Sequence, residues 1–419
     1  MIFVHCRIKP GGALSVLEAL IAKEIRHWQS VDAIFTVYSD RDFLEVINYK
    51  WWVISWWWEN LKLKTQHLTL LKIPIVTALP RRLNNLFRRA DDTKPRGISS
   101  IIDYRNLMPI FPELMKILSW RLATSCKQQA IEKDLKLKAW SLRPTATKKI
   151  IISSYAVAKN IDIPDGRQST IYFHQPMHYI WTLYDAYVES MTGWRKRLYK
   201  KVTPRLRTWD QKPRHYDTIY ANSESTKKQI KKIYFPLLSP KIEVVHPPIA
   251  EQFFHEQVVT KPDNYFFYIN RLTRLFKHLD RIILLCNKYS VPLIIAWDGP
   301  DKAYLQSIAW PTITFVGWVS NIEDKIVLMK KSRGVLNIAH ESFGITTAEA
   351  LLLGVPVFGY DGGATPELLD TKSGVLTPSV EVDQMSSYFE QFLMAEYDRQ
   401  AIQDHAKGLL EKKQEFRKE

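Results

Sequence analysis

The stretch GVLNIAHESFGITTAEALLLGVPVF, residues 334–358, decides the fold. Its first apolar run, Gly334–Ile338, predicts a buried strand, and the periodic apolar segment Thr346–Leu353 predicts a helix. A second apolar run, Val355–Phe358, predicts the next strand. A strand, a helix and a strand at this spacing form a βαβ unit, which implies a parallel sheet.

The same alternation continues on both sides of this stretch. The second half offers a further helix at Asp280–Tyr289 and strands at Tyr265–Ile269, Val291–Ala296 and Ile313–Val316. The first half offers strands at Ile2–Ile8, Ile34–Tyr38, Ile73–Thr77, Lys149–Ser153, Ser169–Phe173 and Thr218–Ala221. Residues 80–148 are basic and contain several prolines, which predicts helices and loops. Because 419 residues exceed what one core organises, two α/β domains are expected.

The paired prolines after His246 predict a stiff connection between these domains. We therefore expect an N-terminal domain at 1–248 and a C-terminal domain at 249–390. Residues 391–419 are expected to form a terminal helix able to cross back to the first domain.

Composition narrows the class of protein. Hydrophobic residues make up 46% and charged residues 24%, which is typical of a globular protein. No apolar run approaches the roughly 18–20 residues of a spanning helix, and the first residues lack the pattern of a signal peptide. The three cysteines are far apart and show no metal-binding spacing, which favours buried thiols in a reducing cytosol.

The net charge of +16 is unevenly distributed. Residues 1–250 hold 41 basic against 21 acidic residues, a balance of +20, whereas residues 251–419 hold 18 against 22, a balance of −4. This asymmetry predicts that the first half meets an anionic partner. Nucleic acid, an anionic membrane and a pyrophosphate-linked lipid all fit that charge.

The segment His340–Ala350 carries the strongest chemical signal. The backbone N–H groups of Phe343, Gly344 and Ile345 lie where the predicted helix begins, which suits a phosphate. Glu341 precedes the helix and Glu349 follows about two turns later, so the two carboxylates suit two hydroxyl-bearing parts of one ligand. The simpler alternative is a solvated helix with two unrelated acids.

Asn270-Arg271-Leu272, followed by Lys277, forms a second group at the end of a predicted strand. Two cations there suit a diphosphate whose negative charge grows as it leaves. Arg274 is close enough in sequence to replace Arg271. Surface charges flanking a strand are the alternative.

The first half contains weaker signals. Gly11-Gly12 lies between a predicted strand and a predicted helix, Leu14–Glu24, where its amides suit a phosphate or merely a tight turn. His174 ends the strand Ser169–Phe173, where a lone histidine is often structural. The tryptophan-rich run WWVISWWW, residues 51–58, is either a buried element or an anchor at a membrane surface, with Arg81, Arg82, Arg88 and Arg89 nearby.

These residues resemble family 4 of the retaining glycosyltransferases, which have the GT-B fold: two Rossmann-like domains facing each other across a cleft. The E-x(7)-E pattern of that family matches Glu341 and Glu349. The resemblance implies that Glu341 contacts the donor sugar and that Glu349 contacts the nucleotide ribose. It also implies that the amides of Phe343, Gly344 and Ile345 bind the distal phosphate.

The resemblance assigns further roles. Arg271 and Lys277 would hold the pyrophosphate, Val316 and Trp318 would lie beside the base, and His174 would face the donor sugar near the reacting centre. The segment PGGALSVLEAL, residues 10–20, is similar to the mannosyltransferase-like branch, which places Gly12 at the donor or acceptor. The sequence departs from the family pattern at Asn270, His278 and Trp297, where glycine is usual, and at His178, where arginine is usual.

The function implied is a retaining hexosyl transfer from a nucleotide diphosphate sugar, with GDP-mannose preferred, to a glycan or a polyprenyl-pyrophosphate-linked acceptor. The sequence predicts no cofactor and no metal site: no DxD-like metal site is evident, and Arg271 and Lys277 could neutralise the diphosphate instead. It predicts peripheral attachment to an anionic membrane on the cytoplasmic face, with nucleic acid as a disfavoured partner. A GT-B phosphorylase and a non-catalytic GT-B scaffold that binds nucleic acid or membrane are the alternatives.

Overall fold

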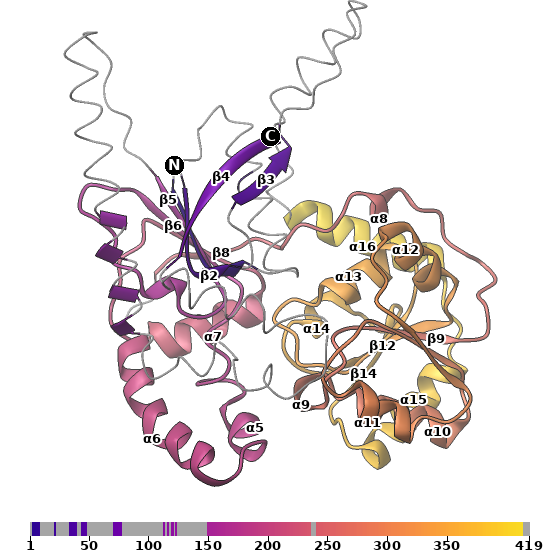
Figure 1. Cartoon of the computed structure of the whole chain (residues 1–419). Coiled ribbons are helices and arrows are strands. Elements are labelled where there is room, and N and C mark those ends of the chain that lie inside the picture. The colour runs from indigo at the N-terminus through magenta and orange to yellow at the C-terminus, as the bar shows by residue number, and fades with distance from the viewer. Residues whose placement is uncertain are drawn as a thin grey trace, which may run out of the picture.

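The computed structural model describes residues 149–235 and 240–413 continuously. In the first third of the chain it describes residues 2–8, 21, 33–39, 43–47, 70–77, 112–113, 115–116, 119–120 and 122–123. Two parallel-stranded sheets, each covered by helices, lie side by side (Figure 1).

The first sheet has the strand order β3-β4-β2-β1-β5-β6-β7-β8. Its strands are β1 Ile2–Ile8, β2 Ala33–Ser39, β3 Phe43–Ile47, β4 Leu70–Thr77, β5 Ile150–Ser154, β6 Ser169–Phe173, β7 Thr218–Ala221 and β8 Ile242–Val244. All neighbouring pairs are parallel except β3 with β4, which is antiparallel. β1, β6 and β7 have the bounds that the sequence predicts, whereas β3 and β8 were not predicted.

The helical segments of this domain with defined bounds are η2 Ala158–Asn160, α5 Tyr184–Glu189, α6 Gly193–Asp210 and α7 Glu224–Tyr234, and the described residues between 112 and 123 are also helical. α7 begins after β7 because the Ser223 hydroxyl accepts a hydrogen bond from Thr226 N, which caps the first turn. Ile21, inside the predicted helix Leu14–Glu24, is helical and buried.

The second sheet has the order β11-β10-β9-β12-β13-β14, and every pair is parallel. Its strands are β9 Phe266–Ile269, β10 Leu293–Ala296, β11 Ile313–Gly317, β12 Gly334–Asn337, β13 Val357–Tyr360 and β14 Gly374–Thr377. Its helices are α8 Gln252–His255, α9 Arg274–Lys277, α10 Leu279–Tyr289, α11 Lys302–Ile308, α12 Ile322–Lys331, α13 Ile345–Leu352, α14 Thr365–Leu368, α15 Val382–Met394 and α16 Arg399–Lys413. The parallel βαβ pattern predicted for this half is confirmed.

Several boundaries differ from the prediction, and two of these differences have a structural explanation. β13 begins at Val357 rather than Val355, because Pro356 has no N–H to donate within a ladder. The predicted domain end at residue 390 falls inside α15, whose Phe389 and Phe392 are buried in the second domain. Ile402, Ala406 and Leu410 of α16 pack into the core of that same domain, not into the first.

No helix within the described ranges is both long and apolar enough to span a bilayer.

Candidate functional site

The loop after β12 and the start of α13 form the centre of the site. Gly344 precedes the helix with a φ of +95°, a conformation that side chains other than glycine adopt at a cost. No side chain caps the first turn of α13. The amides of Phe343, Gly344 and Ile345 therefore stand at an uncapped helix start, which is the arrangement that binds phosphate groups.

Glu341 is held in place by the segment after β13. Glu341 and Gly363 form an isolated parallel bridge, in which Ala364 N donates to Glu341 O at 2.9 Å. A Cβ atom at Gly363 would lie 2.2 Å from Glu341 O, so a larger residue would displace Glu341. The glycine pair at 362–363 therefore positions the first glutamate of the E-x(7)-E pattern.

Lys277, the last residue of α9, pairs with Glu341. Lys277 Nζ lies 2.6 Å from Glu341 Oε1, and each side chain is 19% exposed. The structure thus brings together two predicted site residues that are 64 positions apart. Because an ammonium group has three donors, Lys277 can keep Glu341 as a partner and still bind a phosphate oxygen.

Glu349 lies on α13 and pairs with Lys325 of α12, a residue that the sequence did not suggest. Lys325 Nζ lies 2.5 Å from Glu349 Oε2, and Glu349 is only 6% exposed. Burial raises the pKa of the Glu349 carboxyl, and the Lys325 ammonium offsets part of that rise. Within the described part of the chain, no hydrogen bond reaches Glu349 Oε1, which leaves that oxygen for a ligand hydroxyl.

The two arginines near β9 differ in their surroundings. Arg274 is engaged: its Nε lies 3.6 Å from Asp301 Oδ1, and its guanidinium lies 4.2 Å from the centroid of the Tyr304 ring. Arg271 is exposed, and no described acidic side chain pairs with it. Arg271 is therefore the better available cation for a phosphate.

The backbone conformation explains why glycine is usual at two of the three positions where this sequence departs from the glycine of the family pattern. His278 has a φ of +49° and Trp297 a φ of +105°, both in the region that glycine tolerates best. Trp297 also contacts Trp318, with 4.0 Å between ring centroids. Asn270, by contrast, has no positive φ and donates to Asn337 Oδ1 at 3.5 Å.

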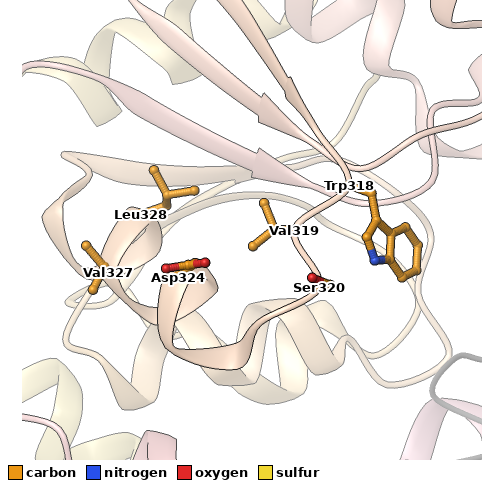
Figure 2. A pocket seen from close by; sticks show the side chains of 6 residues that line it. All are labelled: Trp318, Val319, Ser320, Asp324, Val327 and Leu328. Carbon is orange, nitrogen blue, oxygen red and sulfur yellow. The ribbon is translucent and has the colours of Figure 1, made fainter.

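A hollow of about 390 Å³ opens beside β11 and α12 (Figure 2). Trp318, Val319 and Ser320 line it from the loop, and Asp324, Val327 and Leu328 line it from α12. Its size suits a small ligand. Of the predicted site residues only Trp318 borders it, and neither Lys277 nor Glu341 lines it. Val316 is exposed but does not line the hollow.

His174 follows β6 and is buried on the first-domain side. Its Nε2 lies 2.7 Å from the Ser153 hydroxyl, and its ring packs edge-on against Tyr172 and Tyr155. The described partners of the ring thus belong to the first domain, and the predicted contact with a donor sugar stays a prediction.

His178 lies where the two domains meet. Gln175 Nε2 lies 2.9 Å from His178 Nδ1, and His178 Nε2 lies 3.2 Å from the Tyr187 hydroxyl. Its ring also faces Phe276 of α9, at 6.5 Å between centroids. Both ring nitrogens of His178 are therefore engaged by protein groups. This arrangement does not favour a contact between His178 and an acceptor substrate, the role of the arginine that is usual at this position.

A buried polar network supports the loop that carries these histidines. Asp210, at the end of α6, lies 3.0 Å from Lys159 Nζ and accepts hydrogen bonds from Asn160 Nδ2 and Trp181 Nε1, each at 2.8 Å. Lys159 and Asp210 are almost completely buried. Lys159 and Trp181 thus both contact the buried Asp210.

The two domains touch at the loop between β12 and α13. The Ser223 hydroxyl donates to Ser342 O at 2.6 Å, beside Glu341. Glu367 of α14 accepts hydrogen bonds from Glu224 N at 2.8 Å and from Ser225 N at 2.6 Å. A carboxylate of the second domain therefore caps α7 of the first, at the end where a helix favours negative charge. Glu367 was not predicted, since nothing in the sequence reveals a cap across domains.

Several predicted residues cannot be placed. Gly12, the tryptophans of residues 51–58 and the four arginines of residues 81–89 lie outside the described residues. Among the described residues, no three His, Cys, Asp or Glu side chains gather in a group that could hold a metal ion.

Comparison with known proteins points to the same half of the chain. Residues 250–408 match the family described as "Glycosyl transferases group 1". The chain is also 33% identical, over 127 residues, to a GDP-mannose-dependent alpha-mannosyltransferase of Mycobacterium tuberculosis (strain CDC 1551 / Oshkosh), which is 30% of this chain and 33% of that protein. The protein of the same name from Mycolicibacterium smegmatis (strain ATCC 700084 / mc(2)155) is 31% identical over 93 residues, or 22% and 24% of the two chains. The chain thus spans a third or less of these curated relatives.

Solved structures resemble the whole chain. HepE of Anabaena in complex with UDP has a TM-score of 0.55 at 14% identity, covering 99% of this chain and 95% of its own. Sucrose-phosphate synthase of Thermosynechococcus elongatus has a TM-score of 0.56 at 13% identity, covering 99% and 94%. These similarities confirm the fold, which is GT-B, with two Rossmann-like domains.

Proposed function

We propose that this protein is a glycosyltransferase that uses a nucleotide diphosphate sugar and retains the configuration at the transferred sugar carbon. The observation that carries the proposal is the pairing of Lys277 with Glu341 beside the uncapped start of α13, within the segment that matches group 1 glycosyl transferases.

Each part of a donor has a suitable partner in this arrangement. The amides of Phe343, Gly344 and Ile345 suit the distal phosphate, and Lys277 and Arg271 suit the growing negative charge of the leaving diphosphate. Glu341 would accept hydrogen bonds from the sugar, and Glu349, through Oε1, from the ribose. Val316 and Trp318 would lie beside the base.

Transfer then needs neither a metal nor an enzyme nucleophile. The bond between the sugar carbon and the phosphate oxygen breaks, and the acceptor oxygen bonds to the same face of the sugar. The departing phosphate takes the proton of the acceptor hydroxyl. His174 would face the donor sugar from the first domain.

GDP-mannose is the proposed donor, because the two curated relatives carry GDP-mannose and alpha-mannosyltransferase in their names. The proposed acceptor is a glycan or a polyprenyl-pyrophosphate-linked sugar at the cytoplasmic face of a membrane. The basic first half, at +20, supports an anionic acceptor.

The test is to incubate the protein with a panel of nucleotide sugars and to measure release of the nucleoside diphosphate. We expect slow hydrolysis of one donor, with GDP-mannose fastest, and a sugar product that first appears with the anomeric configuration of the donor in NMR spectra. Release from no donor would contradict the enzyme assignment. An inverted first product would contradict retention alone.

A further inference from the structure

Helix α6 presents an outer face that combines aromatic, aliphatic and basic side chains. We define the α6 outer face as Trp194, Arg197, Leu198, Lys201 and Arg205, which recur at helical spacing and are all exposed. Trp194 is 68% exposed and Leu198 43%, which is unusual for large apolar side chains on the same face of a helix. Figure 1 shows α6 along the outer edge of the first domain, away from the second domain.

The opposite face of α6 is fixed to the domain. Tyr199, Thr203, Leu206 and Asp210 are buried, and they lie on the side of the helix opposite the outer face. Asp210 joins the polar network with Lys159 described above. A helix so anchored holds its outer side chains in a rigid row.

The charge of α6 is one-sided. Its sequence, GWRKRLYKKVTPRLRTWD, contains seven basic residues and a single acidic residue, Asp210, which is buried. Basic side chains attract anionic lipid headgroups, and a tryptophan favours the boundary between lipid and water. A row of cations around an exposed indole and a leucine therefore fits a negatively charged membrane surface.

Nucleic acid would also attract these cations. Leu198 favours the membrane over nucleic acid. An aliphatic side chain is stabilised by entering the acyl boundary of a bilayer, whereas it has neither a ring to stack on a base nor a group to hydrogen-bond with one. Together with Trp194 it forms an apolar pair at i and i+4, with basic residues on both sides.

We propose that the α6 outer face docks on an anionic membrane, with Trp194 and Leu198 inserted among the headgroups. This inference rests on the proposed function, since it places the acceptor side of the enzyme at the membrane. The inner side of α6 holds the loop that follows β6: Tyr199 OH donates to Tyr179 O, and Arg207 Nε donates to Ile180 O at 2.7 Å. Docking therefore brings this loop to within about one helix diameter, roughly 10–12 Å, of the lipid.

The test is sedimentation of the full chain with vesicles of phosphatidylcholine, with and without phosphatidylglycerol. The wild-type protein should bind only the anionic vesicles. Replacing Arg197, Lys201 and Arg205 with glutamine should weaken binding by roughly a hundredfold, since each charge near the surface contributes about fivefold. Trp194→Ala should abolish the part of the binding that resists high salt.

A matched control removes the same charge elsewhere. Lys261, Lys331 and Lys372 are exposed lysines of the second domain without an ion pair among the described residues, and their triple glutamine variant should bind like the wild type. Equal loss in the control, or wild-type binding by both α6 variants, would overturn the proposal. The proposal would also be overturned by an α6 variant that no longer binds single-stranded DNA but still binds anionic vesicles like the wild type.

Measuring nucleotide-sugar hydrolysis without vesicles separates this proposal from the proposed function. The α6 variants should hydrolyse the donor at the wild-type rate, which also shows that they are folded. If the wild-type protein binds vesicles through α6 but hydrolyses no donor, the proposed function fails and the docking surface stands.

Discussion

The Glu349 carboxyl is buried and forms an ion pair with Lys325. Glu349 lies on α13, seven residues after Ser342, within the same segment as Glu341. In the proposed site its carboxylate accepts ligand hydrogen bonds fully only while it is ionised. Burial opposes that ionisation and Lys325 supports it. Lys325 is thus a positioning residue of the proposed ribose site.

Donor affinity should depend on pH through Glu349. Because its pKa is raised, the carboxyl takes up a proton at a higher pH than an ordinary glutamate does. The protonated form accepts fewer ribose hydrogen bonds, so donor affinity should fall as the pH is lowered through that raised pKa. Calorimetric titration at a series of pH values should show this step in the wild type and its absence in Glu349→Gln. An identical step in both would mean that another group titrates.

Glu341→Gln and His174→Ala should lower turnover far more than nucleotide affinity, because both side chains are assigned to the sugar. Loss of a hydrogen bond to a charged group costs about 1.5–3 kcal/mol, so kcat of Glu341→Gln should fall roughly ten- to a hundredfold. The Kd for the nucleoside diphosphate should change little. Near-normal turnover in either variant would remove that residue from the proposed mechanism.

From sequence, the candidate site could be predicted only within local segments, chiefly residues 341–349 and residues 271–277. Glu341, Gly344 and Glu349 share a single strand-to-helix unit, so their spacing suggested them as site residues. Lys325 and Glu367 come from other elements, and only the folded chain shows that one meets Glu349 and that the other reaches α7. Their partners are set by packing, not by spacing.

At the level of elements, the apolar pattern found most of the strands but missed β3, β8 and β14. β6 and β7 have their predicted bounds because they are short apolar runs between turns. β14, with two half-buried residues, and β8, with three residues, give too weak a signal. α6 was not predicted because its sequence is largely basic and contains Pro204, so its apolar periodicity is faint.

The anchoring of α6 makes a prediction about stability. Lys159→Met leaves Asp210 buried without its ion-pair partner, which typically costs about 3–5 kcal/mol. The exposed pair Lys116–Glu113 is the control, and Lys116→Met should cost at most about 1 kcal/mol. Urea unfolding followed by circular dichroism measures both. Equal effects would mean that the buried network does not stabilise the first domain.

At the scale of the whole molecule, the two domains are joined at the loop between β12 and α13. Ser223 donates to Ser342, and Glu367 caps α7, so the junction lies next to Glu341. Phe276, the residue before Lys277, packs against the first-domain core. The contacts between the domains therefore involve Ser342 and Phe276, the direct sequence neighbours of Glu341 and Lys277. A change in the domain contact should thus shift these two charged side chains.

Glu367→Gln should weaken the contact between the domains, because the amide lacks the charge that the α7 amides favour. We expect a larger radius of gyration in small-angle scattering and a higher KM for the donor. Glu381→Gln is the control, since Glu381 pairs with Arg281 inside the second domain. A radius and KM equal to the wild type would show that Glu367 does not hold the domains together.

The central claim is that the second domain binds a nucleotide diphosphate sugar through Glu349 and its neighbours. Calorimetric titration of GDP-mannose into the wild-type protein and into Glu349→Ala tests it most directly. The account predicts one binding site in the wild type and an affinity roughly ten- to a hundredfold lower in the variant, from the loss of about 1.5–3 kcal/mol. Equal affinities in the two proteins would contradict it.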